Sequence, residues 1–350
     1  MRISAIERTC ALSRVVGTSA LLMLACMQAY ACPVAPATMR AMQLVAHGGP
    51  ENLKVADMPV PTAAAGEVLI RISAASVNPV DWKMRMSQGL PMKFPVVQGA
   101  DASGTVVALG AGVKAFKCGD AVVAFLDEAP QGGYAEYVTA VVSSIALKRA
   151  DLTFREAAAY PLVAVTAWQM IELAGIAKGE RVLVQGGAGG VGGMAVQIAK
   201  ARGAYVIATA SARNQEYLKS IGADEAIDYA ATAFEDVVHD LDVVLDTVGG
   251  ETLKRSPAVL KKGGRLITVT GRPPADVCKS SGITCATAEA SNQGNALAHV
   301  SDLARKGQLR VNVEATFPLE KAGEAQELNR AGHTRGKIVL DVRDDAAAKS

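Results

Sequence analysis

The chain has 350 residues, of which half are hydrophobic and a fifth charged, so it is long and apolar enough for two domains with sizeable cores. Lys and Arg (36) nearly balance Asp and Glu (34), which excludes the basic surplus typical of nucleic-acid-binding proteins. Six cysteines and four histidines form no CxxC, HxxxH or HExxH pattern, and this argues against a zinc site built from neighbouring residues.

The amino-terminal segment is typical of an export signal. Three arginines, Arg2, Arg8 and Arg14, precede the apolar run Val15–Met27, which has the length of a signal-peptide core and is short of a membrane span. Ala29-Tyr30-Ala31 then fits a cleavage site. We therefore expect residues 1–38 to be a signal peptide or N-terminal extension, cleaved near Ala31, and the protein to be periplasmic with no membrane span after processing.

Two alternatives concern the same segment. Translation that begins at Met39 would give a cytoplasmic protein, whereas a lipoprotein cleavage site at Leu24-Ala25-Cys26 fits less well because Met23 stands where Leu is usual. Export would allow a disulfide between Cys278 and Cys285, which are seven residues apart. In the cytoplasm both would be ordinary reduced thiols.

Residues 39–160 consist of short apolar runs broken by Gly and Pro, which predicts a compact β-rich domain. The expected strands are Val68–Ile72, Ala102–Val107, Ala121–Phe125 and Tyr134–Val138. Residues 307–350 contain two strand-like segments, Leu309–Val313 and Lys337–Val342, on either side of a helix. We expect this last part of the chain to return to the first domain and complete it.

Between these parts, residues 161–306 alternate helix and strand, which predicts a parallel sheet covered on both faces. Helices are expected at Thr166–Ile176 and Val191–Arg202, and strands at Arg181–Gln185, Ala204–Ala210, Ala226–Tyr229, Leu241–Asp246 and Arg265–Thr270. The predicted fold class is therefore α/β, with a β-rich domain beside a doubly wound parallel-sheet domain.

A glycine-rich loop lies at the first strand-to-helix junction of the parallel sheet. Gly187-Ala-Gly-Gly-Val-Gly192 fits the GxGxxG pattern of dinucleotide-binding proteins, in which a pyrophosphate binds at the helix N-terminus. The second strand ends with Ser211 and Arg213 and offers no carboxylate for the 2′-hydroxyl of NAD. A hydroxyl and a guanidinium can bind a 2′-phosphate instead, so NADP(H) is the expected cofactor.

The sequence resembles the medium-chain dehydrogenase/reductase superfamily, in its zinc-independent, quinone-oxidoreductase-like branch. The motifs that carry the resemblance cover nearly everything after residue 38; beside the glycine loop they are Met39-Arg-Ala-Met-Gln, His47-Gly-Gly-Pro50, Ser76-Val-Asn78-Pro-Val-Asp81-Trp-Lys83, Gly99-Ala-Asp101-Ala-Ser-Gly104, Gly119-Asp120, Gly132-Gly-Tyr-Ala-Glu136, Thr166-Ala-Trp-Gln169, Gly222-Ala-Asp224, Asp246-Thr-Val-Gly-Gly250 and Gly332-His-Thr-Arg-Gly-Lys337-Ile-Val. Taken together these motifs are specific, although each one alone is weak.

This resemblance implies a GroES-like catalytic domain, made from both ends of the chain, and a Rossmann domain, with NADPH in the cleft between them. The implied contacts are of three kinds: the pyrophosphate with Gly187, Gly189, Gly190, Val191 and Gly192; the 2′-phosphate end with Ser211, Arg213 and Tyr229; the nicotinamide side with Thr166, Val248 and Gly249. Asn78 stands where zinc-using relatives have a cysteine ligand, and Ala100-Asp101 where they have a His-Glu pair. No catalytic metal is therefore expected.

Without zinc there is no Lewis acid to polarise a simple aldehyde, and hydride transfer to an electron-poor acceptor is easier. The expected function is NADPH-dependent reduction of quinones or α,β-unsaturated carbonyl compounds. Asn78 and Tyr134 are the candidate hydrogen-bond donors to the substrate oxygen, although a turn and a packing role are open for them. Asp81 and Asp101 are expected to be structural carboxylates.

Two other functions stay open at this point. NADPH is kept in the cytosol, and no twin-arginine motif marks export of a folded holoprotein, so a non-catalytic cell-envelope protein that binds a nucleotide or ligand is the first alternative. A zinc-dependent alcohol dehydrogenase is the second, against which the missing ligands count. Relatives commonly dimerise through the edge of the Rossmann sheet, so a homodimer is one of the assembly states to test.

Overall fold

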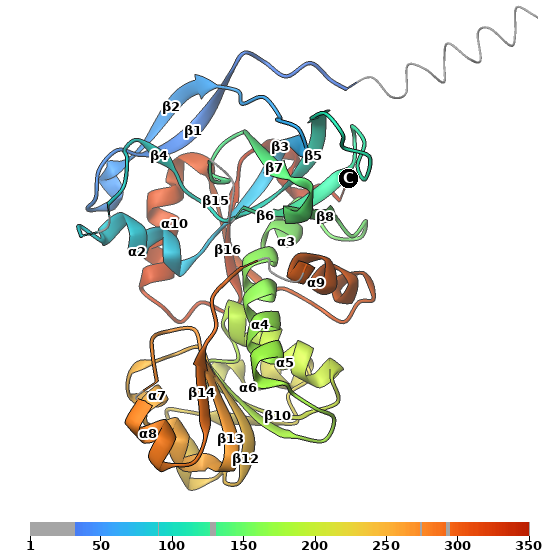
Figure 1. Cartoon of the computed structure of the whole chain (residues 1–350). Coiled ribbons are helices and arrows are strands. Elements are labelled where there is room, and N and C mark those ends of the chain that lie inside the picture. The colour runs from blue at the N-terminus through green and yellow to red at the C-terminus, as the bar shows by residue number, and fades with distance from the viewer. Residues whose placement is uncertain (1–31, 90, 127–130, 274, 292–294, 350) are drawn as a thin grey trace, which may run out of the picture.

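The computed structural model describes residues 32–349 except 90, 127–130, 274 and 292–294. The expected signal peptide, its cleavage site near Ala31 and the alternative lipoprotein site all lie outside the described residues. The described chain forms two lobes, one β-rich and one with a helix-covered sheet, and segments from both ends of the chain meet in the β-rich lobe (Figure 1).

The β-rich lobe contains two sheets. The smaller has the order β2-β1-β4, with bounds β1 Thr38–Leu44, β2 Leu53–Pro59 and β4 Val96–Val97. The larger has the order β15-β16-β3-β5-β6-β8 with β7 also paired to β3; the bounds are β3 Glu67–Val77, β5 Asp101–Leu109, β6 Ala121–Phe125, β7 Tyr137–Val141, β8 Ile145–Leu147, β15 Val313–Pro318 and β16 Lys337–Asp341. Its helices are α2 Pro79–Met86, α3 Phe154–Ala158 and α10 Ala322–Arg330.

The C-terminal segment completes this lobe. Strand β16 pairs antiparallel with β3, so that Ile338 lies opposite Val77, and β15 pairs parallel with β16 on its other side. Ile338 and Val77 are both fully buried in the core of the lobe. The end of the chain is thus part of the same sheet as residues near position 70.

The second lobe holds a six-stranded sheet in which all pairs are parallel. Its order is β11-β10-β9-β12-β13-β14, which is the Rossmann order 3-2-1-4-5-6. The strand bounds are β9 Arg181–Gln185, β10 Tyr205–Ala210, β11 Glu225–Asp228, β12 Leu241–Asp246, β13 Leu260–Thr268 and β14 Thr284–Thr287. The helices are α4 Pro161–Ala174, α5 Gly190–Ala201, α6 Gln215–Ser220, α7 Gly250–Arg255, α8 Ala275–Ser280 and α9 Ala296–Arg305.

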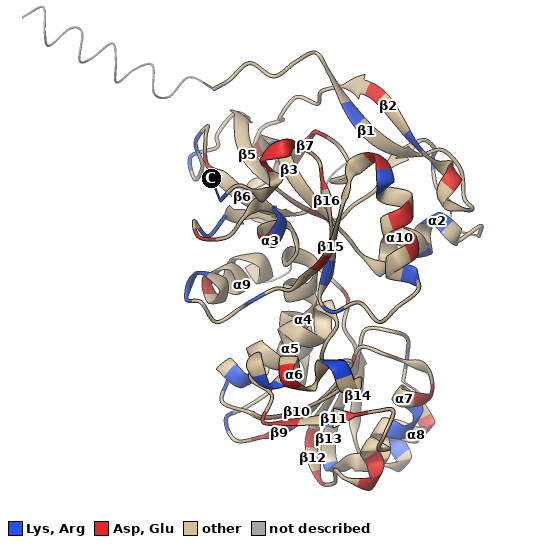
Figure 2. Cartoon of the chain, turned by 180° about the vertical axis from the view of Figure 1, so that it is seen from behind, with Lys and Arg blue, Asp and Glu red and all other residues tan. Residues whose placement is uncertain are grey.

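Alternation along the strands gives this sheet a core on each face. Val182 and Val184 of β9 pack in the cluster that includes residues of α4 and α5, whereas Leu183 between them packs with residues of α7 and α8. The predicted α/β class, with a GroES-like β-rich domain and a doubly wound Rossmann domain, is confirmed. Lys and Arg are interspersed with Asp and Glu over both lobes, as the balanced composition suggests (Figure 2).

One element prediction is wrong. Leu309–Val313 is no strand, because Leu309 packs in the Rossmann core and Gln197 hydrogen-bonds both the N–H and the carbonyl of Arg310. The strand of this region, β15, begins only at Val313. The helix predicted at Thr166–Ile176 is α4, which already begins at Pro161.

All four cysteines within the described residues are paired. Cys278 of α8 is bonded to Cys285 of β14, the pair that export would allow, and Cys32 is bonded to Cys118. The second pair joins the start of the described chain to the turn between β5 and β6.

In the described part of the chain, one stretch, Phe154–Ala174, is long and apolar enough to cross a membrane. This stretch comprises α3 and α4, and 72% of the apolar window lies buried inside the protein. It is therefore packed as a core element of the fold.

Candidate functional site

A cleft of about 750 Å³ lies between the two lobes and is lined by residues of both. The β-rich lobe contributes the end of β3, the start of α2 and the start of β16; the Rossmann lobe contributes α4, the glycine-rich loop and the ends of β12, β13 and β14. This is the crevice at the carboxyl ends of the strands, where open α/β sheets bind their ligands. Of the predicted site residues, Asn78, Thr166, Gly189, Gly190, Val191 and Gly192 line it.

The glycine-rich loop has the geometry of a phosphate cradle. A Cβ on Gly192 would lie 2.2 Å from the carbonyl oxygen of Gly186, and one on Gly187 would lie 2.9 Å from Ala208 Cβ, so both positions exclude a side chain. Helix α5 begins at Gly190, and the N–H groups of its first turn lack intrahelical acceptors. The loop therefore presents free donors and the positive end of a helix to the cleft, and it fits a dinucleotide pyrophosphate.

The return segment of the β-rich lobe rests on this loop. Gly336 donates its N–H to the carbonyl of Ala188 at 2.9 Å, and Gly189 and Gly336 form an isolated parallel bridge. Because β16 begins at the next residue, the sheet of one lobe starts at the phosphate loop of the other.

The three residues expected at the 2′-phosphate end lie around the ends of β10 and β11, outside the cleft lining. Ser211 follows β10, Arg213 lies in the next turn, and Tyr229 follows β11 with 52% exposure. The Arg213 guanidinium is about half exposed, donates to the carbonyl oxygen of His333 at 2.6 Å and lies 3.8 Å from Glu314. It is thus held at the edge of the site by the opposite lobe.

The residues expected on the nicotinamide side are divided between two elements. Thr166 of α4 lines the cleft, and its hydroxyl donates to the carbonyl oxygen of Leu162. Val248 and Gly249 follow β12, next to Thr247, which lines the cleft. Buried Asp246 accepts hydrogen bonds from Gly249 N–H and from the hydroxyls of two threonines of the β13 end, Thr268 and Thr270, and so fixes this turn.

A buried polar cluster lies behind the β-rich wall of the cleft. Asn78 caps α2 through its N–H to Asp81 Oδ2 (2.8 Å), and its side-chain Nδ2 donates to Asp101 Oδ2 (2.7 Å). Lys337 Nζ donates to Asn78 Oδ1 and to the carbonyl of Val77, and it lies 3.7 Å from Asp101 Oδ2. Both ends of the Asn78 amide are thereby engaged within the protein.

Tyr134 belongs to this cluster but not to the cleft lining. Its ring is fully buried, and its hydroxyl donates to Asp81 Oδ2 at 2.7 Å. Burial, with the Asp81 charge beside it, raises the pKa of Tyr134 well above its ordinary value. Burial likewise raises the pKa of Asp81 to about 6, against the lowering effect of its hydrogen bonds.

Lys337 was not assigned a role from the sequence, although it stands in the Gly332–Val339 motif. Its side chain is buried at the cleft, and burial lowers its pKa despite the carboxylates of Asp101 and Asp81 nearby. A lysine followed by the continuous apolar run Ile338–Leu340 is a signal for a polar side chain at the end of a buried strand. Its partners at positions 77, 78 and 101 cannot be found from local spacing.

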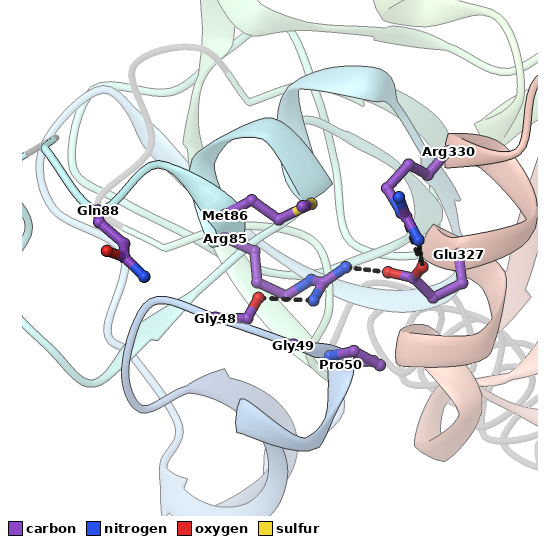
Figure 3. A pocket seen from close by; sticks show the side chains of 8 residues that line it. All are labelled: Gly48, Gly49, Pro50, Arg85, Met86, Gln88, Glu327 and Arg330. Atoms are coloured by element: carbon purple, nitrogen blue, oxygen red, sulfur yellow. Dashed lines mark hydrogen bonds and ion pairs between the residues drawn. The ribbon is translucent and has the colours of Figure 1, made fainter.

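A second hollow, of about 230 Å³, lies between α2, α10 and residues 48–50 (Figure 3). Buried Arg85 donates to Gln326, to the carbonyl of Gly48 and to Glu327, and Glu327 also accepts from Arg330. These bonds use the donors of Arg85 to fasten α2 against α10. Both helices supply cleft residues, Lys83 and Asn329, so the contact fixes the outer wall of the cleft.

Within the described residues, no group of three or more His, Cys, Asp or Glu side chains lies close enough to hold a metal ion. At Asn78 and Asp101 the resemblance implies zinc ligands in relatives; here the two side chains are hydrogen-bonded to each other. Lys337 donates to Asn78 and forms an ion pair with Asp101.

Comparison with known proteins identifies the family. Residues 64–151 match the alcohol dehydrogenase GroES-like domain, and residues 221–340 match the zinc-binding dehydrogenase model. A chloroplast envelope quinone oxidoreductase homolog of Arabidopsis thaliana is 34% identical over 323 residues, which are 87% of this chain and 98% of that protein. The chain belongs to the quinone-oxidoreductase-like branch of the medium-chain dehydrogenase/reductase superfamily.

Other members of this superfamily are similar to the same extent. The 2-methylene-furan-3-one reductase of Solanum lycopersicum is 36% identical, over 87% of this chain and 79% of that protein. The structure of the quinone oxidoreductase from Coxiella burnetii has a TM-score of 0.80 and 35% identity, and it covers 87% of this chain and all of that one. The predicted family is thus confirmed, and the chain is a member of a family of oxidoreductases.

Proposed function

We propose that this protein is a reductase that uses NADPH to transfer a hydride to quinones or α,β-unsaturated carbonyl compounds, without catalytic zinc. The observation that carries the proposal is the single cleft into which the glycine-rich loop and the Asn78–Lys337 pair both open. One wall fits a dinucleotide, and the rest of the lining includes the apolar side chains of Val77, Val80, Phe125 and Leu162. These apolar side chains suit the ring of a quinone or the carbon chain of an enone.

The chain's own residues would hold the coenzyme in three places. The first-turn N–H groups of α5 would bind the pyrophosphate, Thr166 and the turn after β12 would lie by the nicotinamide, and Arg213 with Ser211 and Tyr229 would bind the 2′-phosphate. When bound, the coenzyme supplies the hydride of its reduced nicotinamide ring. The protein then has to orient the acceptor, exclude water and place a hydrogen-bond donor at its oxygen.

The polar cluster supports chemistry without a metal. The side-chain oxygen of Asn78 accepts a hydrogen bond from Lys337, and its side-chain nitrogen donates one to Asp101. The Asn78 amide therefore offers no free atom to a metal ion. A buried ammonium at this place would also repel a divalent cation. Asn78 lines the cleft and stays a candidate for contact with the substrate, whereas Tyr134, bonded to Asp81 behind the wall, would act through that carboxylate.

We further propose that the protein works in an oxidising compartment, the periplasm. The support is the pair of disulfides, Cys32–Cys118 and Cys278–Cys285, because such bonds persist mainly outside the cytosol. The same observation favours the second candidate function, a cell-envelope protein that keeps the cleft but binds a ligand without turnover, since NADPH is a cytosolic coenzyme.

The two functions are separated by one experiment. Purified protein is mixed with NADPH and 1,4-benzoquinone, or with an enone, and the nicotinamide absorbance is followed, with NADH and a chelator in parallel. We expect oxidation of NADPH that a chelator does not reduce, and zinc well below one ion per chain. Binding of NADPH without oxidation would favour the binding protein, and loss of activity with the chelator would contradict the zinc-free mechanism.

A further inference from the structure

A buried lysine reaches the cleft from the last strand of the protein. Lys337 is the first residue of β16, and its side chain is 4% exposed. Its aliphatic part lies against the glycine-rich loop, because a Cβ on Gly190 would be 3.1 Å from Lys337 Cδ. The ammonium then reaches the β-rich wall, where Val77 and Asn78 line the cleft beside it.

The ammonium is held by two acceptors. Nζ donates to the Val77 carbonyl at 2.7 Å and to Asn78 Oδ1, and it forms an ion pair with Asp101 Oδ2 at 3.7 Å, a distance longer than a hydrogen bond. A lysine ammonium has three donors. In the part of the chain that the structure describes, no third acceptor lies within hydrogen-bond distance of Nζ.

Such a cation is expensive to bury for a structural purpose alone. Taking an ammonium out of water costs several kcal/mol unless it is fully paired, and burial accordingly lowers the pKa of Lys337. The Asp101 carboxylate already accepts from Ser76, Asn78 and Leu162 N–H, so it is satisfied without the lysine. A donor held in place before the reaction, at a position where negative charge develops, is the arrangement that stabilises an oxyanion.

We propose that the Lys337 ammonium donates a hydrogen bond to the carbonyl oxygen of the substrate and stabilises the negative charge that this oxygen gains on reduction, with Asn78 and Asp101 as positioning residues. This inference rests on the proposed function. It places the Lys337 ammonium beside Asn78 and Asp101, the two positions at which the resemblance implies zinc ligands in relatives.

The proposal is tested first by binding, without coenzyme turnover. The probe is 4-nitrophenol, whose ionised and neutral forms differ in absorbance. We expect the wild-type cleft to favour the ionised form by at least about tenfold over water at the same pH. Lys337→Met should abolish this preference, Lys337→Arg should keep most of it, and Lys54→Met, which removes an exposed lysine of β2 outside the cleft lining, should leave it. No preference in the wild type, or an equal loss in Lys54→Met, would overturn the proposal.

Kinetics give the second test. Lys337→Met should lower kcat/KM for an enone by about 100-fold or more, while the NADPH dissociation constant, measured by nicotinamide fluorescence, changes less than about threefold. An equal loss in NADPH binding would mean that Lys337 serves the coenzyme, and the proposal would fall. Should the wild type bind the phenolate but reduce no acceptor, the proposed function fails while the anion site stands.

Discussion

Arg213 of the Rossmann lobe donates a hydrogen bond of 2.6 Å to the backbone carbonyl of His333 in the opposite lobe. Three residues further on, Gly336 donates to Ala188 of the glycine-rich loop. The short segment from His333 to Lys337 therefore contacts the proposed 2′-phosphate end, the phosphate loop and the polar cluster in turn.

Arg213→Ala should discriminate between the two coenzymes. We expect the NADPH dissociation constant to rise by at least about tenfold and the NADH constant to change little, because only NADPH carries the 2′-phosphate that a guanidinium can bind. Fluorescence titration measures both. Arg335→Ala is the matched control. Arg335 lies on the same segment as His333, but its guanidinium lies over the ring of Tyr217. Equal losses for NADPH and NADH would refute the role of Arg213.

Alanine substitutions at two glycines of the loop should differ in their effect on stability but not in the direction of their effect on NADPH binding. A Cβ on Gly192 would lie 2.2 Å from the Gly186 carbonyl oxygen, whereas one on Gly189 meets only that oxygen at 3.4 Å. Gly192→Ala should therefore lower the unfolding free energy by about 2 kcal/mol or more, and Gly189→Ala by much less. Both should weaken NADPH binding, since both positions line the cleft. Urea unfolding and titration check this, and equal stability of the two variants would contradict it.

Asp81 should give the protein a measurable pH dependence. Its folded-state pKa of about 6 lies above the ordinary 3.8, so the stability from this group is fully present below pH 3.8 and is lost as the pH rises through 6. Asp81→Asn keeps an oxygen for Tyr134 and Asn78 to donate to and removes the charge.

The unfolding free energy of Asp81→Asn, relative to wild type, should therefore rise by about 1.4 kcal/mol between pH 5 and 7.5. Urea unfolding at the two pH values measures this difference. Asp57→Asn, at an exposed position of β2, serves as the control. A constant difference between Asp81→Asn and wild type across this range would show that Asp81 does not titrate there.

The number of free and disulfide-bonded cysteines should show where the mature chain begins. If it begins near Cys32, alkylation without reductant should add no label, and after reduction four. A chain that begins at Met39 lacks Cys32 and would leave Cys118 free for at least one label before reduction. Intact mass of the natively produced protein distinguishes these results.

The same bonds should differ in their contribution to stability. Cys118→Ser opens a loop of 86 residues and Cys285→Ser one of 7, so the chain-entropy model gives losses of about 4–5 and about 2 kcal/mol. Thermal unfolding of the two variants without reductant compares them. A larger loss for Cys285→Ser would contradict the ranking.

Local patterns predicted the Rossmann lobe well, because its strands and its phosphate loop are specified by adjacent residues. Strands β9 and β12 have the predicted bounds, Arg181–Gln185 and Leu241–Asp246. The segment around Arg310 could not be predicted, because a side chain more than a hundred positions away, Gln197, binds its backbone.

The polar cluster was beyond sequence reasoning for the same reason. Asn78 could be singled out from its motif, but its partner Lys337 lies 259 positions away. Tyr134 was a candidate donor to the substrate, with a packing role left open. Its hydroxyl donates to Asp81 and does not line the cleft. In a domain made from both ends of a chain, the fold decides which side chains meet.

The pairing of β16 with β3 has a consequence for the order of synthesis. Strand β3 is synthesised before the Rossmann lobe, whereas its antiparallel neighbour β16 is synthesised only after it. The Rossmann lobe is continuous in sequence, so it can fold before β16 is synthesised and the β-rich lobe is complete. A chain that lacks Lys337–Asp341 would therefore have an open sheet edge at β3 and an incomplete cleft.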